Sequence, residues 1–199
     1  MRAPTLVVVV LTVVFALASG CRTVNVSSDY RLDSSKNVGL AIVSLTMAGL
    51  PSGFNVFVNY RGVNVDHKSA VAVSDLFSSA DWRCPFLGMA TDENPCGRLA
   101  VIELQPGEYE FYSWRGESGG GPGSIQFTVR STVDFSKRFK VIPGTAVYLG
   151  NVHFSIDRRI FGGGSYQMLI TDRRDRDLTL LHSKHPSITP DRVVVSLLE

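Results

Sequence analysis

Two pairs of titratable side chains have spacings that could support chemistry. His182 and His185 are three residues apart, so on a helix they would share one face and could supply two metal ligands. No aspartate or glutamate follows at a useful spacing, and Pro186 ends such a helix at once. The pair is better explained as positive charge at the carboxyl end of a helix, and we predict no metal site and no cofactor.

The second pair, Asp66 and His67, has the elements of an acid and a base. Neighbouring residues in a strand or loop point apart, and no nucleophile motif such as GxSxG accompanies them. The glycine runs Gly116 to Gly123 and Gly162 to Gly164 lack the spacing of phosphate-binding loops and are interpreted as flexible hairpin loops. We therefore predict no catalytic residues and expect the protein not to be an enzyme.

The chain has three cysteines, Cys21, Cys84 and Cys96. If Cys21 is modified, the other two remain as an even pair that flanks a loop-like stretch. A disulfide between Cys84 and Cys96 would close this loop and contribute about 3 kcal/mol in the chain-entropy model. The alternative is a metal or redox pair, against which stand the absence of CxxC spacing and of an adjacent histidine.

The segment before Cys21 has the organisation of an export signal. Arg2 provides a positive charge, Leu6 to Leu17 is an unbroken apolar run, and residues 1–20 contain no acid. The run is shorter than the roughly 20 apolar residues of a spanning helix, and it ends in small residues. We predict that this segment directs the chain out of the cytoplasm and is then removed.

The residues Ala18, Ser19, Gly20 and Cys21 resemble the lipobox of bacterial lipoproteins, in which small or apolar residues precede a modified cysteine. The resemblance implies that residues 1–20 are a lipoprotein signal peptide and that Cys21 becomes the acylated amino terminus. Several acyl chains, palmitate among them, would anchor the protein in a membrane, since each buried methylene contributes about 0.8 kcal/mol. Ala18 stands where leucine is commonest, and the alternative is an ordinary secretory peptide cleaved near Ala18.

Residues 21–37 are polar and have no periodic apolar face, so we predict that they form a tether between membrane and domain. Arg22 occupies the position after the lipidated cysteine. In Gram-negative lipoproteins an aspartate there favours the inner membrane, so the resemblance implies an outer-membrane protein facing the periplasm if the host is Gram-negative.

From Val38 onward, short β-branched and aromatic runs alternate with Gly, Pro, Asn and Asp, a pattern typical of all-β proteins. Residues 38–199 are therefore predicted to be a single mainly β domain, an antiparallel two-sheet sandwich of immunoglobulin-like or transthyretin-like type. Acids at the start and cations at the end of Asp175 to His185 predict one short C-terminal helix, and Arg192 to Leu198 predicts a last strand. The other predicted strands are Val38 to Met47, Phe54 to Tyr60, Arg98 to Leu104, Tyr109 to Trp114, Ser124 to Arg130, Phe135 to Ile142, Ala146 to Phe154 and Tyr166 to Thr171.

Pro-Gly occurs twice between predicted strands, at Pro106-Gly107 and Pro143-Gly144, with Tyr109 and Tyr148 in the strands that follow. Proline presets φ and glycine accepts the positive φ of a type II turn, so each dipeptide predicts a hairpin. Over roughly residues 98–155 this arrangement resembles uncharacterised envelope lipoproteins of the DUF2846 type and wider transthyretin-like or carboxypeptidase-regulatory-like sandwiches. That family has no catalytic residues to carry over.

The strand Tyr109 to Trp114 carries the densest group of aromatic residues. Most of these rings are expected in the core, where each contributes on the order of 2 kcal/mol. Strand alternation places Tyr112 and Trp114 on the face opposite Phe111. If that face is open, these two residues are a possible partner patch.

Charge excludes one class of partner. The chain has a formal charge of +2, and loss of Arg2 with the signal leaves +1, without a lysine and arginine stripe, so no nucleic acid is expected. We expect a lipid-anchored envelope protein with a non-enzymatic binding, structural or assembly role, in contact with the membrane and an envelope protein partner. The alternatives are an envelope hydrolase or metal-dependent enzyme, with histidines and carboxylates converging from distant loops, and an accessory lipoprotein of a secretion or adhesion system.

Overall fold

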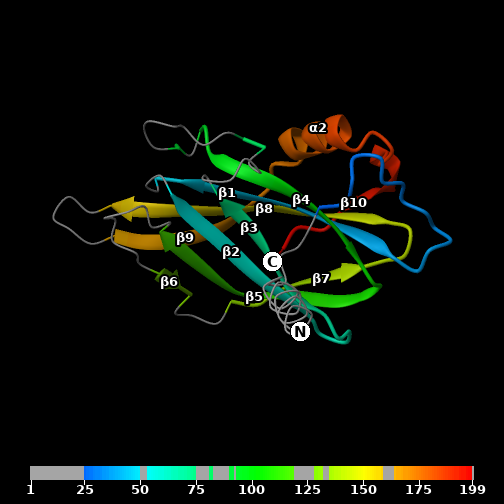
Figure 1. Ribbon diagram of the computed structural model, residues 1–199, viewed down its shortest axis with the longest axis horizontal. Helices are drawn as coiled ribbons and strands as arrows, with labels where there is room; N and C mark the ends of the chain where they lie inside the picture. Colours follow the sequence, from blue (N-terminus) through cyan, green and yellow to red (C-terminus); the bar gives the residue numbers. More distant parts are fainter. Residues whose placement is uncertain are drawn as a thin grey trace, which may run out of the picture.

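The computed structural model describes residues 25–49, 53–74, 81–82, 90–91, 93–118, 128–131, 135–158 and 164–198, which fold into two facing β-sheets (Figure 1). The first sheet has the strand order β10-β8-β1-β4, with β9 also paired to β8. Its strands are β1 (Gly39–Ala48), β4 (Cys96–Leu104), β8 (Ala146–Arg158), β9 (Gly164–Thr171) and β10 (Val193–Val195).

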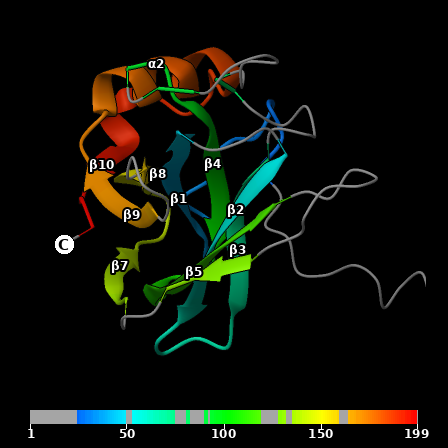
Figure 2. The same ribbon diagram turned by 90° about the vertical axis from the view of Figure 1, so that its left-hand side faces the viewer.

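The second sheet has the order β3-β2-β5-β6, with β7 also paired to β5. Its strands are β2 (Phe54–Gly62), β3 (Lys68–Ser74), β5 (Gly107–Ser118), β6 (Thr128–Arg130) and β7 (Lys137–Val141). Helix α2 (Arg174–Lys184) lies over the outer face of the first sheet and gives the molecule a third layer, as Figure 2 shows. The predicted fold, a mainly β two-sheet sandwich with a short C-terminal helix, is confirmed.

Two details of the fold differ from the simplest antiparallel arrangement. Strand β8 pairs in parallel with both β1 and β10, while the other pairings are antiparallel. Strand β3 was not among the predicted strands, because its small residues Ser69, Ala70 and Ala72 give a weak strand signal. The 3₁₀ turn η1 (Pro190–Arg192) precedes β10, and no helix of the described residues has the length and apolarity needed to span a bilayer.

Strand β1 connects the two hydrophobic clusters of the molecule. All ten of its residues are buried. Because successive side chains point to opposite faces, Val43 and Leu45 join the core between the sheets, whereas Leu40 and Ile42 join the cluster beneath α2. Burial of each such side chain contributes about 1.5–3 kcal/mol, so β1 stabilises both interfaces at once.

Aromatic rings fill much of the space between the sheets. The ring centres of Tyr109 and Phe139 lie 5.5 Å apart, and those of Phe54 and Phe154 lie 6.1 Å apart. Such pairs contribute about 0.5–1.5 kcal/mol beyond the area that they bury. Gly116 is required beside Phe54, because a Cβ at this position would come within 2.5 Å of the ring.

Residues 25–37, which we call the N-terminal segment, lie against the first sheet. The side-chain amide of Asn25 donates to the Leu99 carbonyl oxygen at 2.9 Å, and its oxygen accepts the Val101 N–H at 3.2 Å. Leu32 is 5% exposed and packs in the cluster beneath α2. The polar tether predicted over residues 21–37 is thus part of the folded body from Asn25 on, and Cys21 to Val24 lie outside the described residues.

Candidate functional site

The structure separates the two aromatic residues predicted to share a contact patch. A β-bulge interrupts the pairing of β5 with β2 and leaves Tyr112 as an extra residue between the paired residues Phe111 and Ser113. Beyond the bulge the alternation of β5 is reversed, so Trp114 points into the core, with its ring centre 4.8 Å from that of Phe154. This corrects the expectation of a shared face, because strict alternation cannot show a bulge, and only Tyr112 lies on the outer face.

The outer face of the second sheet around Tyr112 is rich in cations. The guanidinium carbon of Arg61 lies 4.8 Å from the centre of the Tyr112 ring, and the ammonium nitrogen of Lys68 lies 5.6 Å from it. Arg115 lies 4.2 Å over the ring of Phe57. Both arrangements are cation–π contacts. Cross-strand pairing puts further cations on this side, and we define the cationic face as Arg61, Lys68, Arg115, Arg130, Arg138 and Lys140.

Carboxylates neutralise only part of the cationic face. Arg61 forms an ion pair of 2.6 Å with Glu110, and Arg115 forms one of 2.8 Å with Glu117. Hydrogen bonds from Arg61 and then from Ser136 hold the pKa of Glu110 below its usual range, so this carboxylate is ionised at neutral pH. Glu108, opposite Lys140 across β5 and β7, is the third acid of this face. Among the residues that the structure describes, the six cations therefore exceed the three carboxylates on this side.

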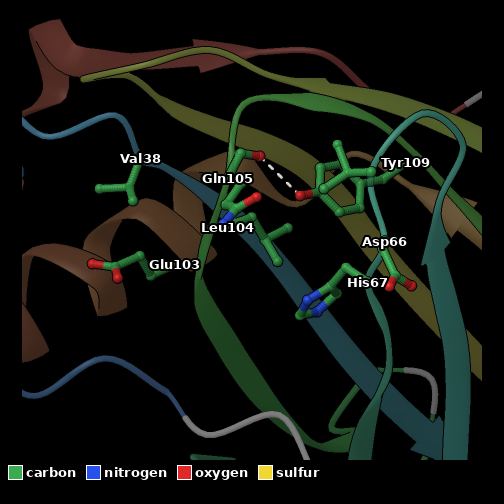
Figure 3. Close-up of a pocket in the computed structure, with 8 residues that line it drawn as sticks. Val38, Asp66, His67, Glu103, Leu104, Gln105 and Tyr109 are labelled. Atoms are coloured by element: carbon green, nitrogen blue, oxygen red, sulfur yellow. Dashed lines mark hydrogen bonds between the residues drawn. The ribbon is translucent and has the colours of Figure 1, made fainter.

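A pocket of about 250 Å³ lies at one end of the sandwich (Figure 3). The ring centre of His67 is 5.6 Å from that of Tyr60, and its Nε2 is 3.4 Å from the Tyr60 hydroxyl. Burial raises the pKa of Tyr109, whose protonated hydroxyl donates to the Gln105 carbonyl oxygen at 2.8 Å. Figure 3 shows the Asp66 carboxylate turned away from the His67 ring, so these two do not form a paired acid and base. The lining residues are Val38, Val65, Asp66, His67, Glu103, Leu104, Gln105 and Tyr109.

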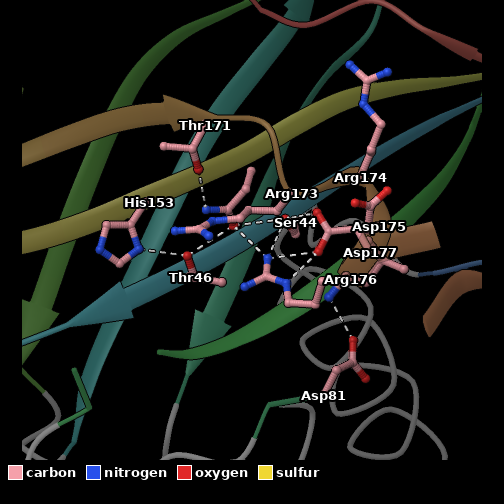
Figure 4. Close-up of polar contacts among 12 residues, drawn as sticks. Ser44, Thr46, Asp81, His153, Thr171, Arg173, Arg174, Asp175, Arg176 and Asp177 are labelled. Atoms are coloured by element: carbon pink, nitrogen blue, oxygen red, sulfur yellow. Dashed lines mark hydrogen bonds and ion pairs between the residues drawn. The ribbon is translucent and has the colours of Figure 1, made fainter. Parts of the chain in front are cut away.

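A buried polar network joins α2 to the outer face of the first sheet (Figure 4). The carboxylate of Asp177 is fully buried and accepts hydrogen bonds from Ser44 at 2.5 Å and from Tyr148 at 2.8 Å. Arg176 pairs with the same carboxylate at 2.8 Å and lies 4.1 Å over the Trp82 ring. Burial, and next the charge of Asp177, raise the pKa of Tyr148, so its hydroxyl stays protonated and can donate.

The network continues along β1 and β8. Thr46 lies 3.0 Å from the side-chain oxygen of Asn151 and 2.8 Å from Nδ1 of His153. When Thr46 donates to Asn151, His153 must carry its proton on Nδ1 to donate to the threonine. The amide of Asn151 then donates to Thr171 at 3.1 Å. These contacts order the polar side chains of three strands beside α2.

The buried polar network is suited to stabilising the fold rather than to acting on a substrate. Ser44, Thr46 and Asp177 are each fully buried, and their polar atoms already have partners within the protein. Sequence analysis missed this network, although a signal was present. Ser44 and Thr46 interrupt an otherwise apolar strand, and buried hydroxyls need hydrogen-bond partners.

The two C-terminal histidines lie in different environments. His182 is exposed in the last turn of α2, whereas His185 is buried at the end of the helix, with Nδ1 3.1 Å from the Ser27 carbonyl oxygen. Burial lowers the pKa of His185, with a smaller contribution from the charge of Lys184. Within the described ranges, no group of three or more His, Cys, Asp or Glu residues is placed to hold a metal ion.

The three cysteines are only partly covered by the structure. Cys96 begins β4, is buried and is disulfide-bonded. Cys84 and Cys21 lie outside the described residues, so the pairing of Cys84 with Cys96 and the lipidation of Cys21 stay predictions.

No protein-family model, no curated protein and no solved structure matches the chain.

Proposed function

We propose that this protein is a lipid-anchored component of the bacterial cell envelope that binds a partner without catalysing a reaction. The observation that carries the binding role is the cationic face, where cations exceed carboxylates around the outward ring of Tyr112. Arginine and aromatic residues are enriched at protein interfaces. A partner with complementary negative charge would be attracted to this face, and its association would weaken with salt.

The anchor is supported by the residues before Cys21. Their positive start, apolar run and small residues ahead of a cysteine match a lipoprotein signal peptide. Metabolic labelling with an alkyne analogue of palmitate tests this part of the proposal. We expect label on the natural protein and none on Cys21→Ala, and equal labelling of both would refute the anchor.

A photo-crosslinking amino acid at Tyr112 tests the binding role in intact cells. We expect a defined crosslinked product at Tyr112 and none at Thr179, an exposed position on α2 on the other side of the molecule. Combining the probe with Lys68→Glu and Arg130→Glu should remove the product while the protein remains folded by circular dichroism. A product that persists after this charge reversal would contradict recognition through the cationic face.

The alternative of an envelope hydrolase has less support among the described residues. A hydrolase needs a nucleophile or an activated water that the substrate can reach. Ser44 lies beside the carboxylate of Asp177, but both are fully buried beneath α2, where a substrate cannot reach them. The more accessible hydroxyl of Ser136 bonds to Glu110, whose carboxylate is already paired with Arg61.

A further inference from the structure

The N-terminal segment is fixed to the body at several separate points. Asn25 bonds to Leu99 and Val101 of β4, and the N–H of Val26 donates to the Val101 carbonyl oxygen at 3.0 Å. Farther along, the Ser27 carbonyl oxygen is bonded by His185 at the end of α2.

The later part of the N-terminal segment is held as well. Leu32 is buried in the cluster beneath α2, and its carbonyl oxygen accepts a hydrogen bond from Arg192. Ser34 lies against Gly144, where an added Cβ would come within 2.9 Å of it. These contacts involve β4, α2, η1 and the turn before β8, so the segment is part of the folded surface from Asn25 on.

This attachment leaves a short connection to the proposed lipid. Asn25 is four residues after Cys21, and a fully extended chain spans at most about 3.3–3.6 Å per residue, which gives about 14 Å. The two sheets of a sandwich are about 10 Å apart, and a helix layer adds about 10 Å. The connection is therefore shorter than the molecule is deep.

We infer that the side of the molecule formed by β4, the N-terminal segment and α2 rests against the bilayer, and that the cationic face points away from it. This orientation depends on the proposed anchor at Cys21. Strand β4 is an edge strand of the first sheet and contacts β3 of the second sheet. Strand β7 of the second sheet instead contacts β8 of the first sheet. Figure 2 shows α2 and the outer face of β2, β3 and β5 at opposite ends of the layered structure.

The orientation limits which partner the cationic face can meet. The bilayer that holds the anchor is on the far side of the sandwich, so its lipid headgroups cannot cover Tyr112 while the N-terminal segment stays attached. The negative charge that this face attracts must therefore belong to a molecule in the aqueous compartment, such as an acidic surface of an envelope protein.

Quenching by nitroxide-labelled lipids tests the orientation in the full-length lipidated protein. A dye is coupled to p-azidophenylalanine at His182, which is exposed on the last turn of α2, or at Thr128, which is exposed on β6 of the second sheet. In vesicles that contain the nitroxide lipid, we expect quenching to be severalfold stronger at position 182 than at position 128.

A longer connection is the matched control. Inserting a Gly-Ser linker of about 12 residues between Val24 and Asn25 allows a mean reach of about 20 Å and should remove most of the difference between the two dyes. Retention on vesicles with equal quenching at both positions would overturn the orientation alone. Failure of the natural protein to stay on vesicles would overturn the anchor and, with it, the orientation.

Discussion

Asp177 is a fully buried carboxylate whose charge is balanced by Arg176. Replacing it with alanine would leave the Tyr148 hydroxyl without its acceptor and the guanidinium without its ion partner. Because breaking a buried pair from one side is strongly destabilising, we expect Asp177→Ala to lower the free energy of unfolding by about 3 kcal/mol, measured by urea denaturation at neutral pH. Asp175→Ala, at an exposed carboxylate of the same helix, should cost less than about 0.5 kcal/mol. Equal losses would contradict the role assigned to the network.

The burial of His185 should make the free energy of unfolding depend on pH. Burial lowers its folded pKa below the ordinary 6.5, so the unfolded chain binds the proton more readily. The contribution of His185 is therefore fully present above about pH 6.5 and is lost as the pH falls toward the folded pKa. We expect the urea midpoint of the natural protein to fall between about pH 7 and pH 5, and His185→Gln, which can still donate to Ser27, to fall less. A parallel decline in both proteins would show that His185 is not the titrating group.

At the scale of elements, the bulge in β5 accommodates Tyr112 as an extra residue without moving the core side chains on either side of it. Deleting Tyr112 would remove the extra residue. Phe111 and Ser113 already pair with the consecutive residues Tyr60 and Asn59, so regular alternation would keep Trp114 and Gly116 on the core side. We expect the deletion variant still to unfold cooperatively on heating, followed by circular dichroism, because the core side chains keep their faces. Tyr112→Ala is the matched control, because it keeps the residue count and the bulge and loses only the cation–π contacts of the outer face, worth about 1 kcal/mol. Loss of cooperative unfolding in the deletion variant, with cooperative unfolding kept in Tyr112→Ala, would refute this account.

The elements themselves could be predicted from sequence because their signals are local. The alternation of Phe54 to Tyr60 and the charges and proline around α2 depend on residues close together in the chain. The bulge at Tyr112 depends instead on β2, and the parallel pairing of β1 with β8 depends on residues about a hundred positions apart. Such contacts leave no local pattern, so the cationic face could be recognised only in the folded chain. Of the buried network, the sequence shows only that Ser44 and Thr46 interrupt an apolar strand.

The start of the folded domain also depends on contacts between residues that are far apart in the chain. Polar composition placed the start of the domain at Val38. In the structure, Asn25 and Val26 instead pair with the edge of β4 that faces away from β1, and Leu32 is buried in the cluster beneath α2. Asn25 has its partner in β4, 74 positions away, and the carbonyl oxygen of Leu32 accepts a hydrogen bond from Arg192 of η1, 160 positions away. The segment is therefore expected to stabilise the whole sandwich, although it contains no strand or helix.

At the scale of the whole molecule, two soluble chains without the anchor test whether the N-terminal segment stabilises the sandwich. A chain beginning at Asn25 should unfold cooperatively, whereas one beginning at Val38 should lose at least about 3 kcal/mol, because burial of Leu32 and several backbone hydrogen bonds are gone. The bare edge of β4 should also promote association, since an unpaired strand edge can pair with another copy. Urea denaturation measures the first effect and size-exclusion chromatography the second. If both chains are equally stable and monomeric, the N-terminal segment contributes nothing to the fold, and the short connection to the membrane inferred from it has no basis.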